Sequence, residues 1–228
     1  MYLDPYYLFL VIPAFILSLI AQGMVQGTYK KMSRELNTRG LTGAAAAAAV
    51  LRHYGITDVR IEQVGGKLSD HYDPRKKVIR LSDGVYNSTS VAAVGIACHE
   101  AGHAAQHAQQ YAPIKIRNTI LPICNIGSYI GIPLAFLGYW LAFEPLILVG
   151  LALYSAIAVF QLVTLPVEFN ASSRALQVID ECGLLADEER SKAAKVLRAA
   201  AMTYVASLAV TLANLLRFAS IFLGKRRK

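Results

Sequence analysis

The heptapeptide from Cys98 to Ala104 contains the residues whose types and spacing point most directly to chemistry. It reads Cys-His-Glu-Ala-Gly-His-Ala, with His99 and His103 four positions apart. On a helix, residues at this spacing lie on one face, so the two imidazoles can bind one Zn²⁺ ion. Glu100 follows the first histidine, and its carboxylate can take a proton from water and deliver it to a leaving amine. The pattern predicts metal-assisted hydrolysis of peptides.

The sequence around this motif favours a helix. Asn87-Ser-Thr-Ser90 offers N-cap residues, and residues 91–110 contain many alanines and no proline. The alternative is a pair of buried core histidines beside a surface glutamate. We consider it weaker, because a glutamate without a partner is rarely buried in so apolar a helix.

The composition indicates a membrane protein. Of the 228 residues, 55% are hydrophobic, and the mean hydropathy is +0.40, which is too apolar for an ordinary soluble domain. Much of the net charge of +8 borders the apolar segments, so we expect anionic lipid headgroups as a partner and no nucleic acid. The three cysteines are scattered and odd in number, which argues against a disulfide framework.

Three uncharged runs divide the chain: residues 5–29, 118–143 and 145–167. Each is long enough to span a bilayer, and Glu144-Pro145 separates the last two into a hairpin. The predicted fold class is a mainly α membrane protein, with a zincin-like α+β catalytic domain that contains a small β-sheet, plus transmembrane helices. The expected parts are an N-terminal anchor (1–29), a cytoplasmic domain with the motif helix (30–117), the hairpin (118–166) and a third-ligand helix with C-terminal helices that complete the catalytic domain (167–228).

Two short segments before the motif helix have strand character, residues 59–64 and 78–82. We expect the strand near Val78 to Leu81 to be an edge strand that holds an extended substrate. Between them lies a turn-rich segment in which His71, with Asp70 and Asp73, offers possible extra metal ligands. A plain turn is the favoured interpretation, because a proline follows Asp73.

Glu168 is the first carboxylate after the hairpin. A hairpin returns to the side of the membrane from which it left, and this is also the side of the motif helix. Two histidines, one glutamate and a water molecule form a known catalytic zinc geometry. The alternative is an interfacial carboxylate paired with Arg174.

The distribution of basic residues predicts the orientation of a multi-pass protein of the cell membrane. Basic residues flank the segment between the first run and the hairpin, whereas the hairpin tip offers only Glu144, which predicts a cytoplasmic motif domain. The last apolar segment, 199–223, conflicts with this orientation, because a full crossing would place Lys225–Lys228 outside. We favour a helix that packs on the catalytic domain or lies in the interface, with a fourth span as the alternative.

Four segments occur in an order that resembles a known family: Leu41-Thr-Gly43, Asp70-His-Tyr-Asp-Pro-Arg75, the motif heptapeptide, and Pro166-Val-Glu-Phe169. Over nearly the whole chain they resemble the bacterial membrane-bound neutral zinc metallopeptidases, the YugP-like proteins. The resemblance implies a plan similar to gluzincin membrane proteases. It also implies Zn²⁺ held by His99, His103 and Glu168, with Glu100 as general base.

The resemblance also directs attention to residues near these ligands. In many gluzincins an aspartate four positions after the glutamate orients a histidine ligand; here it is Ser172, a weaker acceptor. The metzincin pattern fails, because Gln106 and Gln109 stand where a glycine and a third histidine belong. His107 is a possible hydrogen-bond donor beside the ligands, although packing is favoured. The candidates for stabilising an oxyanion are His71, Tyr204 and Arg217.

The sequence thus predicts an integral-membrane zinc-dependent endopeptidase in which Glu100 activates a zinc-bound water. The expected substrate is a membrane-associated peptide or protein. The alternative is a non-catalytic, zinc-stabilised membrane scaffold or assembly factor, which would have no use for a general base beside the metal. A transporter is a weaker option, because the apolar stretches hold almost no ionisable residues.

Overall fold

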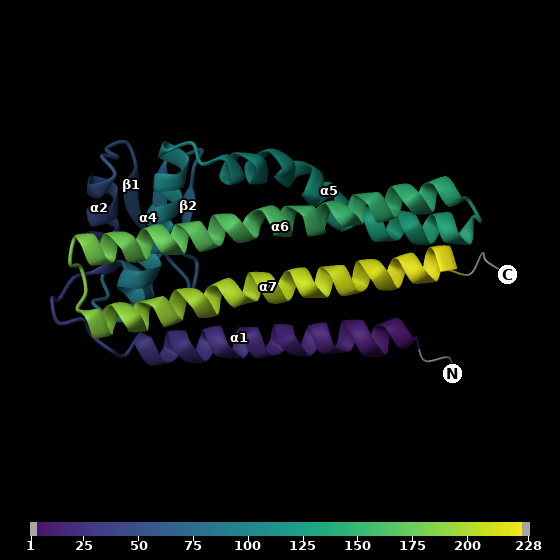
Figure 1. The fold of residues 1–228 in the computed structure, drawn as a ribbon. Coiled ribbons are helices and arrows are strands. Elements are labelled where there is room, and N and C mark those ends of the chain that lie inside the picture. Colours follow the sequence, from purple (N-terminus) through teal and green to yellow (C-terminus); the bar gives the residue numbers. More distant parts are fainter. Residues whose placement is uncertain (1–3, 225–228) are drawn as a thin grey trace. The chain divides into compact units, whose positions relative to one another are not determined.

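The computed structural model describes residues 4–224 and shows a mainly helical protein with one small sheet, as predicted (Figure 1). The basic tail Lys225–Lys228 lies outside the described residues. The elements are η1 (Tyr7–Val11), α1 (Ile12–Met32), α2 (Gly43–His53), β1 (Arg60–Val64), β2 (His71–Asp73), β3 (Val78–Ser82), α3 (Asp83–Tyr86), α4 (Val91–Ala108), α5 (Ala112–Trp140), α6 (Glu144–Glu181) and α7 (Asp187–Gly224).

The chain divides into two compact units. The first, called the apolar unit below, comprises Met1–Gln22, Lys115–Leu165 and Met202–Lys228. The second, called the mixed unit because it contains both helices and the sheet, comprises Gly23–Ile114 and Pro166–Ala201. The helices α1, α5, α6 and α7 contribute residues to both units.

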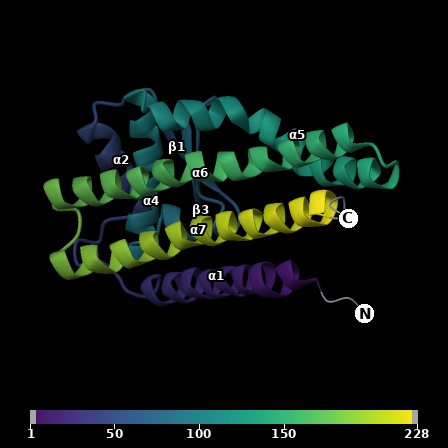
Figure 2. The ribbon, with the colours of Figure 1, turned by 45° about the vertical axis from the view of Figure 1, so that its right-hand side comes forward.

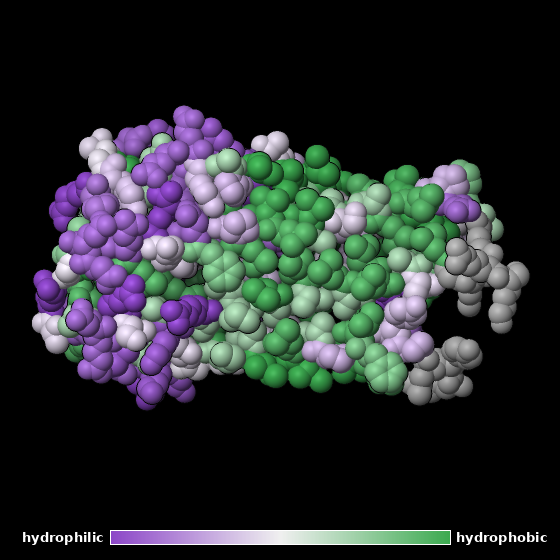
Figure 3. Space-filling view, in the orientation of Figure 1, coloured by the Kyte–Doolittle hydropathy of each residue, from purple (hydrophilic) through white to green (hydrophobic). Residues whose placement is uncertain are grey.

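Among the described residues, four helices are long and apolar enough to cross a membrane: Tyr7–Met32, Ala112–Trp140, Glu144–Glu181 and Asp187–Leu223. In the apolar window of each helix only 17–28% of the residues are buried. A soluble protein would bury most of such windows, so these helices leave a surface suited to lipid. Figure 3 shows hydrophobic residues gathered over the apolar parts of α6 and α7, and hydrophilic residues over the mixed unit.

Within the apolar unit, α5 and α6 approach each other through glycines. A Cβ atom on Gly127 would lie 2.3 Å from the carbonyl oxygen of Leu153, and one on Gly150 would lie 2.5 Å from the backbone nitrogen of Ala135. The two backbones are therefore in direct contact, which is the packing that small residues permit between membrane helices.

The C-terminal helix differs from our expectation. In its apolar half, Phe218 and Phe222 pack with Ala135 and Ile147 of the hairpin. Arg217, the charge that argued against a span, donates to Asp4 at 2.7 Å. A paired charge is far less costly inside an apolar assembly than an isolated one. The structure therefore favours the alternative, a fourth candidate span.

In the mixed unit, the sheet has the order β1-β3-β2. β1 runs parallel to β3, and β2 runs antiparallel to it, with His71 opposite Arg80. The expectation that residues 78–81 form an edge strand is wrong, since β3 is central and the edges are β1 and β2. The physical reason is burial: Val78, Ile79 and Leu81 are fully buried, as the strand has a neighbour on each side and helices against it.

Helix α4 runs through the core of the mixed unit and contacts α2, β2 and β3; Figure 2 shows it beside the sheet. Ser90 caps its start by accepting a hydrogen bond from the Ala93 backbone at 3.2 Å. Because Ala46 and Ala47 of α2 are small and fully buried, the two helices can pack closely. This packing holds the motif helix in a fixed orientation.

Candidate metal centre

Two helices of the mixed unit provide the candidate ligands. His99 and His103 lie on α4, one turn apart, and Glu168 lies on α6. The two helices approach closely at Gly102, where a Cβ atom would lie only 2.6 Å from the carbonyl oxygen of Ala171. Any larger residue at position 102 would push α6 away. The glycine in the motif therefore sets the distance between the two histidines and the glutamate.

The three side chains form one compact cluster. One donor atom from each of them lies within 4.8 Å of the other two. Nε2 of His99 and Nε2 of His103 are 3.3 Å and 3.6 Å from the same oxygen of Glu168. His103 is 8% exposed and Glu168 is 4% exposed, so the cluster lies at the bottom of a largely buried site.

Hydrogen bonds define which nitrogen of His103 can bind a metal. The amide nitrogen of Gln106 donates to the carbonyl of Val167 at 2.8 Å and to Asn170 at 2.9 Å. Its amide oxygen therefore faces Nδ1 of His103, 3.0 Å away, and can only accept. His103 must carry its proton on Nδ1, which leaves the lone pair of Nε2 directed at the cluster.

His99 has a simpler support. Its Nδ1 is 3.0 Å from the hydroxyl of Ser172 on α6. This is the serine that stands where many gluzincins have an aspartate, which is a stronger acceptor. A hydroxyl can accept or donate, so it fixes the tautomer of His99 less firmly than Gln106 fixes that of His103. Both Nδ1 atoms are nevertheless occupied, and both Nε2 atoms face Glu168.

The charges around His103 favour its protonated form in the metal-free protein. Burial lowers the pKa of His103, but the hydrogen bond with Glu168 and the negative charges of Glu100 and Glu168 raise it by more, so its pKa lies above the ordinary value. The same negative charges would favour a bound cation.

The donor set fits Zn²⁺. Two imidazole nitrogens and one carboxylate oxygen form a ligand set of catalytic zinc sites. A tetrahedral ion with bonds of about 2.0–2.1 Å separates neighbouring donors by roughly 3.4 Å, and the two nitrogen–oxygen separations of 3.3 Å and 3.6 Å lie close to this value. All three donor atoms lie within 4.8 Å of one another, so the cluster is compact enough to hold a single ion.

Glu100 lies on α4 beside His99 and is half-buried. Among the residues that the structure describes, no hydrogen bond or ion pair engages its carboxylate. Arg174, the alternative partner of Glu168 considered above, instead donates to Asn170 at 2.7 Å and to Gln109. The arginine thus supports the Gln106 network.

The remaining predicted residues lie in other surroundings. His107 forms a 3.0 Å hydrogen bond with the hydroxyl of Tyr72. His71 is exposed, and its ring contacts the carbonyl of Ser69 at 2.8 Å. Tyr204 and Arg217 belong to the apolar unit. The roles of these residues toward an oxyanion or a ligand stay predictions.

Asp70 and Asp73, considered as extra ligands, have structural partners. Asp70 accepts hydrogen bonds from the backbone and the hydroxyl of Ser82 at 2.7 Å and 3.0 Å. Asp73 accepts from the backbone of Arg75 and Lys76 in the turn before β3. Over the described part of the chain, the cluster of His99, His103 and Glu168 is the one metal-binding group of this kind.

Gln106 is the important residue that the sequence analysis did not identify as part of the site. It served there only to exclude the metzincin pattern. The signal that was present is its position three residues after His103, which places both on one face of a helix. A polar residue in this alanine-rich helix needs a partner, and Gln106 is fully buried.

Together, the fold and the site define a mainly helical protein with four candidate membrane spans and a two-histidine, one-glutamate metal cluster. Residues 7–223 match the family described as "Putative neutral zinc metallopeptidase". The chain is 46% identical over 221 residues to the Bacillus subtilis (strain 168) protein described as "Putative membrane protease YugP", which covers 96% of this chain and 98% of that protein. The chain belongs to this zinc metallopeptidase family. No solved structure matches it.

Proposed function

We propose that this protein is an integral-membrane zinc-dependent endopeptidase in which Glu100 acts as the general base. The observation that carries the proposal is the convergence of two Nε2 atoms and one carboxylate oxygen. The carboxylate of Glu100, on the same helix α4, is near enough to His103 for its charge to raise the pKa of that histidine. Membership of the zinc metallopeptidase family supports it.

The proposed roles follow from the positions of the side chains. His99, His103 and Glu168 would hold the ion, and Gln106 and Ser172 would orient the two imidazoles. Zinc at this position supplies a Lewis acid that polarises a peptide carbonyl and makes water more acidic. An oxygen of Glu100 would take the proton of the attacking water and return it to the nitrogen of the leaving amine. The burial of His103 and Glu168 would exclude bulk water from these steps.

The sheet offers a place for the substrate backbone. β2 pairs with β3, no other strand of the described residues pairs with its second edge, and it contacts α4. An extended peptide could add to β2 and so pass along the helix that carries the histidines. We therefore propose β2 as the substrate-holding edge, in place of the strand expected from the sequence.

We also propose that the mixed unit lies on the cytoplasmic side of the cell membrane, close to anionic headgroups, and that its substrates are membrane-associated. The basic residues that flank it support this orientation.

Cys182 is exposed on the mixed unit, while Cys98 and Cys124 are buried. A membrane-impermeant maleimide should label Cys182 only after the cells are opened; labelling in intact cells would place the unit outside.

The test of the catalytic proposal compares wild type with Glu100→Gln, measuring casein hydrolysis and zinc content in detergent. Glu188→Gln, an exposed carboxylate with 83% of its side-chain surface accessible, is the matched control. We expect all three proteins to bind zinc, and Glu100→Gln alone to lose hydrolysis by about a thousandfold or more. Equal hydrolysis by Glu100→Gln would refute the role of Glu100. Zinc without hydrolysis in wild type, on casein and on membrane-inserted test proteins, would favour a non-catalytic scaffold.

A further inference from the structure

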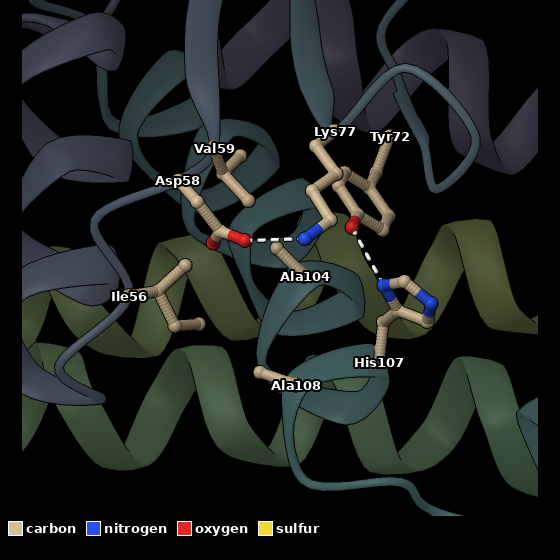
Figure 4. A pocket seen from close by; sticks show the side chains of 8 residues that line it. All are labelled: Ile56, Asp58, Val59, Tyr72, Lys77, Ala104, His107 and Ala108. Atoms are coloured by element: carbon tan, nitrogen blue, oxygen red, sulfur yellow. Dashed lines mark hydrogen bonds and ion pairs between the residues drawn. The ribbon is translucent and has the colours of Figure 1, made fainter.

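We propose that a cavity beside the last turn of α4 is the pocket that receives one large, uncharged side chain of the substrate, close to the bond that is cut. This inference rests on the proposed peptidase function. The cavity has a volume of about 330 Å³ and is shown in Figure 4. It is lined by Ile56, Asp58, Val59, Tyr72, Lys77, Ala104, His107 and Ala108.

The pocket lies next to the metal cluster along α4. Ala104 directly follows the ligand His103, and His107 is one turn further on. A helix rises 1.5 Å per residue, so His107 is about 6 Å along the axis from His103. An extended peptide advances about 3.3 Å per residue. A side chain in the pocket would therefore belong to a residue one or two positions from the bond held at the metal.

The proposed edge strand also leads to the pocket. Tyr72 is the middle residue of β2, and its hydroxyl reaches His107 on α4. The flanking residues His71 and Asp73 point to the other face of the sheet, where both contact Arg80. Side chains opposite each other on paired strands share a face. The substrate residue opposite Tyr72 would consequently point toward α4 and the pocket.

The lining determines which side chain fits. Ile56, Val59, Ala104 and Ala108 form apolar walls, and the volume is at the lower end for ligand pockets, which suits one aliphatic or aromatic side chain. Burial, with the charges of Asp58 and Asp73, raises the pKa of Tyr72 to about 12, so the tyrosine stays neutral.

The two charges in the lining are already paired with each other. Lys77 donates to Asp58, as Figure 4 shows, and this contact holds the pKa of Asp58 below its usual value. A charged substrate side chain would enter without an unpaired opposite charge to meet it, which is unfavourable. The pocket should therefore discriminate against acidic and basic side chains alike.

The decisive experiment removes one charge of this ion pair at a time. Asp58→Asn leaves the ammonium of Lys77 without its partner, and Lys77→Gln leaves the carboxylate of Asp58 without its partner. Both residues are exposed, so we expect both variants to fold and bind zinc. Cleavage sites in unfolded casein are mapped by mass spectrometry for wild type and both variants.

We expect wild type to prefer large uncharged residues over charged ones by about tenfold at one fixed position near the cut. Asp58→Asn should gain cleavage at acidic residues there, and Lys77→Gln should gain it at basic residues. A third variant, Ala108→Leu at an exposed helix position, should shift the preference toward small residues by filling the pocket. Ala45→Leu, exposed on α2, is its control and should behave as wild type.

The outcomes separate this inference from the function on which it rests. Cleavage by wild type with no side-chain preference, or with a preference that none of the three pocket variants alters, would overturn the pocket and leave the peptidase standing. Failure of zinc-loaded wild type and Ala45→Leu to cleave casein or membrane-inserted proteins would overturn the proposed function, and the pocket with it.

Discussion

The two units of the protein both use glycine to bring helices together, but the contacts have different consequences. In the mixed unit, Gly102 lets α4 touch the backbone of α6 at Ala171, and buried polar side chains surround this contact. In the apolar unit, Gly127 lets α5 touch α6 at Leu153 among apolar neighbours. In the mixed unit the close approach thus positions the candidate metal ligands. In the apolar unit it packs two hydrophobic helices against each other.

The largest expected effect comes from filling these two contacts. Gly102→Ala places a methyl group against backbone that cannot rotate away, so α6 must shift, and Glu168 shifts with it. Overpacking typically costs about 1–3 kcal/mol, and we expect zinc affinity to fall between about tenfold and a hundredfold. Gly127→Ala should lower thermal stability in detergent but leave zinc affinity within about twofold of wild type. Equal losses of zinc affinity in both variants would show that the two contacts do not differ in this way.

An effect on zinc affinity of similar size, but without overpacking of the helix contact, should separate the supports of the two histidines. Gln106→Ala removes the acceptor of His103 and leaves buried groups of Val167 and Asn170 with one partner fewer. Loss of such a support typically lowers metal affinity about 10–100-fold, whereas Ser172→Ala should cost only a few-fold, because a hydroxyl is the weaker acceptor. Ser172→Asp should bind zinc more tightly than wild type. Competition with a chelating dye measures all three affinities, and a reversed order would contradict the assignment of Gln106.

The smallest effect concerns the ion pair of the apolar unit. Asp4→Asn leaves Arg217 without its carboxylate partner and should lower the melting temperature in detergent, while Arg217→Gln in the same protein should recover part of the loss. Because water reaches both side chains of this pair, the coupling should be small. Zinc affinity should not change. A change in zinc affinity in either variant would show that the pair acts on the metal centre.

Much of the site is predictable from local sequence because helical spacing is a local property. Three local signals predict α4 directly: the two histidines four residues apart, Ser90 as the capping residue, and the proline-free run that follows it. Glu168 needs one further step, the recognition that a hairpin returns the chain to the side of the membrane from which it came. The structure brings all three candidate ligands together.

The features that sequence reasoning missed depend on distant contacts. The neighbours of β3 come from two other strands, although three apolar side chains within its first four residues were a usable signal for a central position. Arg217 is paired with a residue 213 positions earlier, and no local pattern indicates such a partner. Gln106 accepts from a residue three positions before it and donates to others more than 60 positions after it.

The turn of α6 from Val167 to Ala171 joins the metal centre to the packing of the mixed unit. It supplies Glu168, the carbonyl that orients Gln106 and the backbone against which Gly102 rests. An ion bound to residues of both α4 and α6 would therefore cross-link the two helices. Metal binding and the folding stability of the mixed unit would then be thermodynamically coupled. Free zinc at a hundred times its dissociation constant would add about 2.7 kcal/mol to the stability of this unit. Depletion of zinc would then loosen the contact between α4 and α6 as well as empty the site.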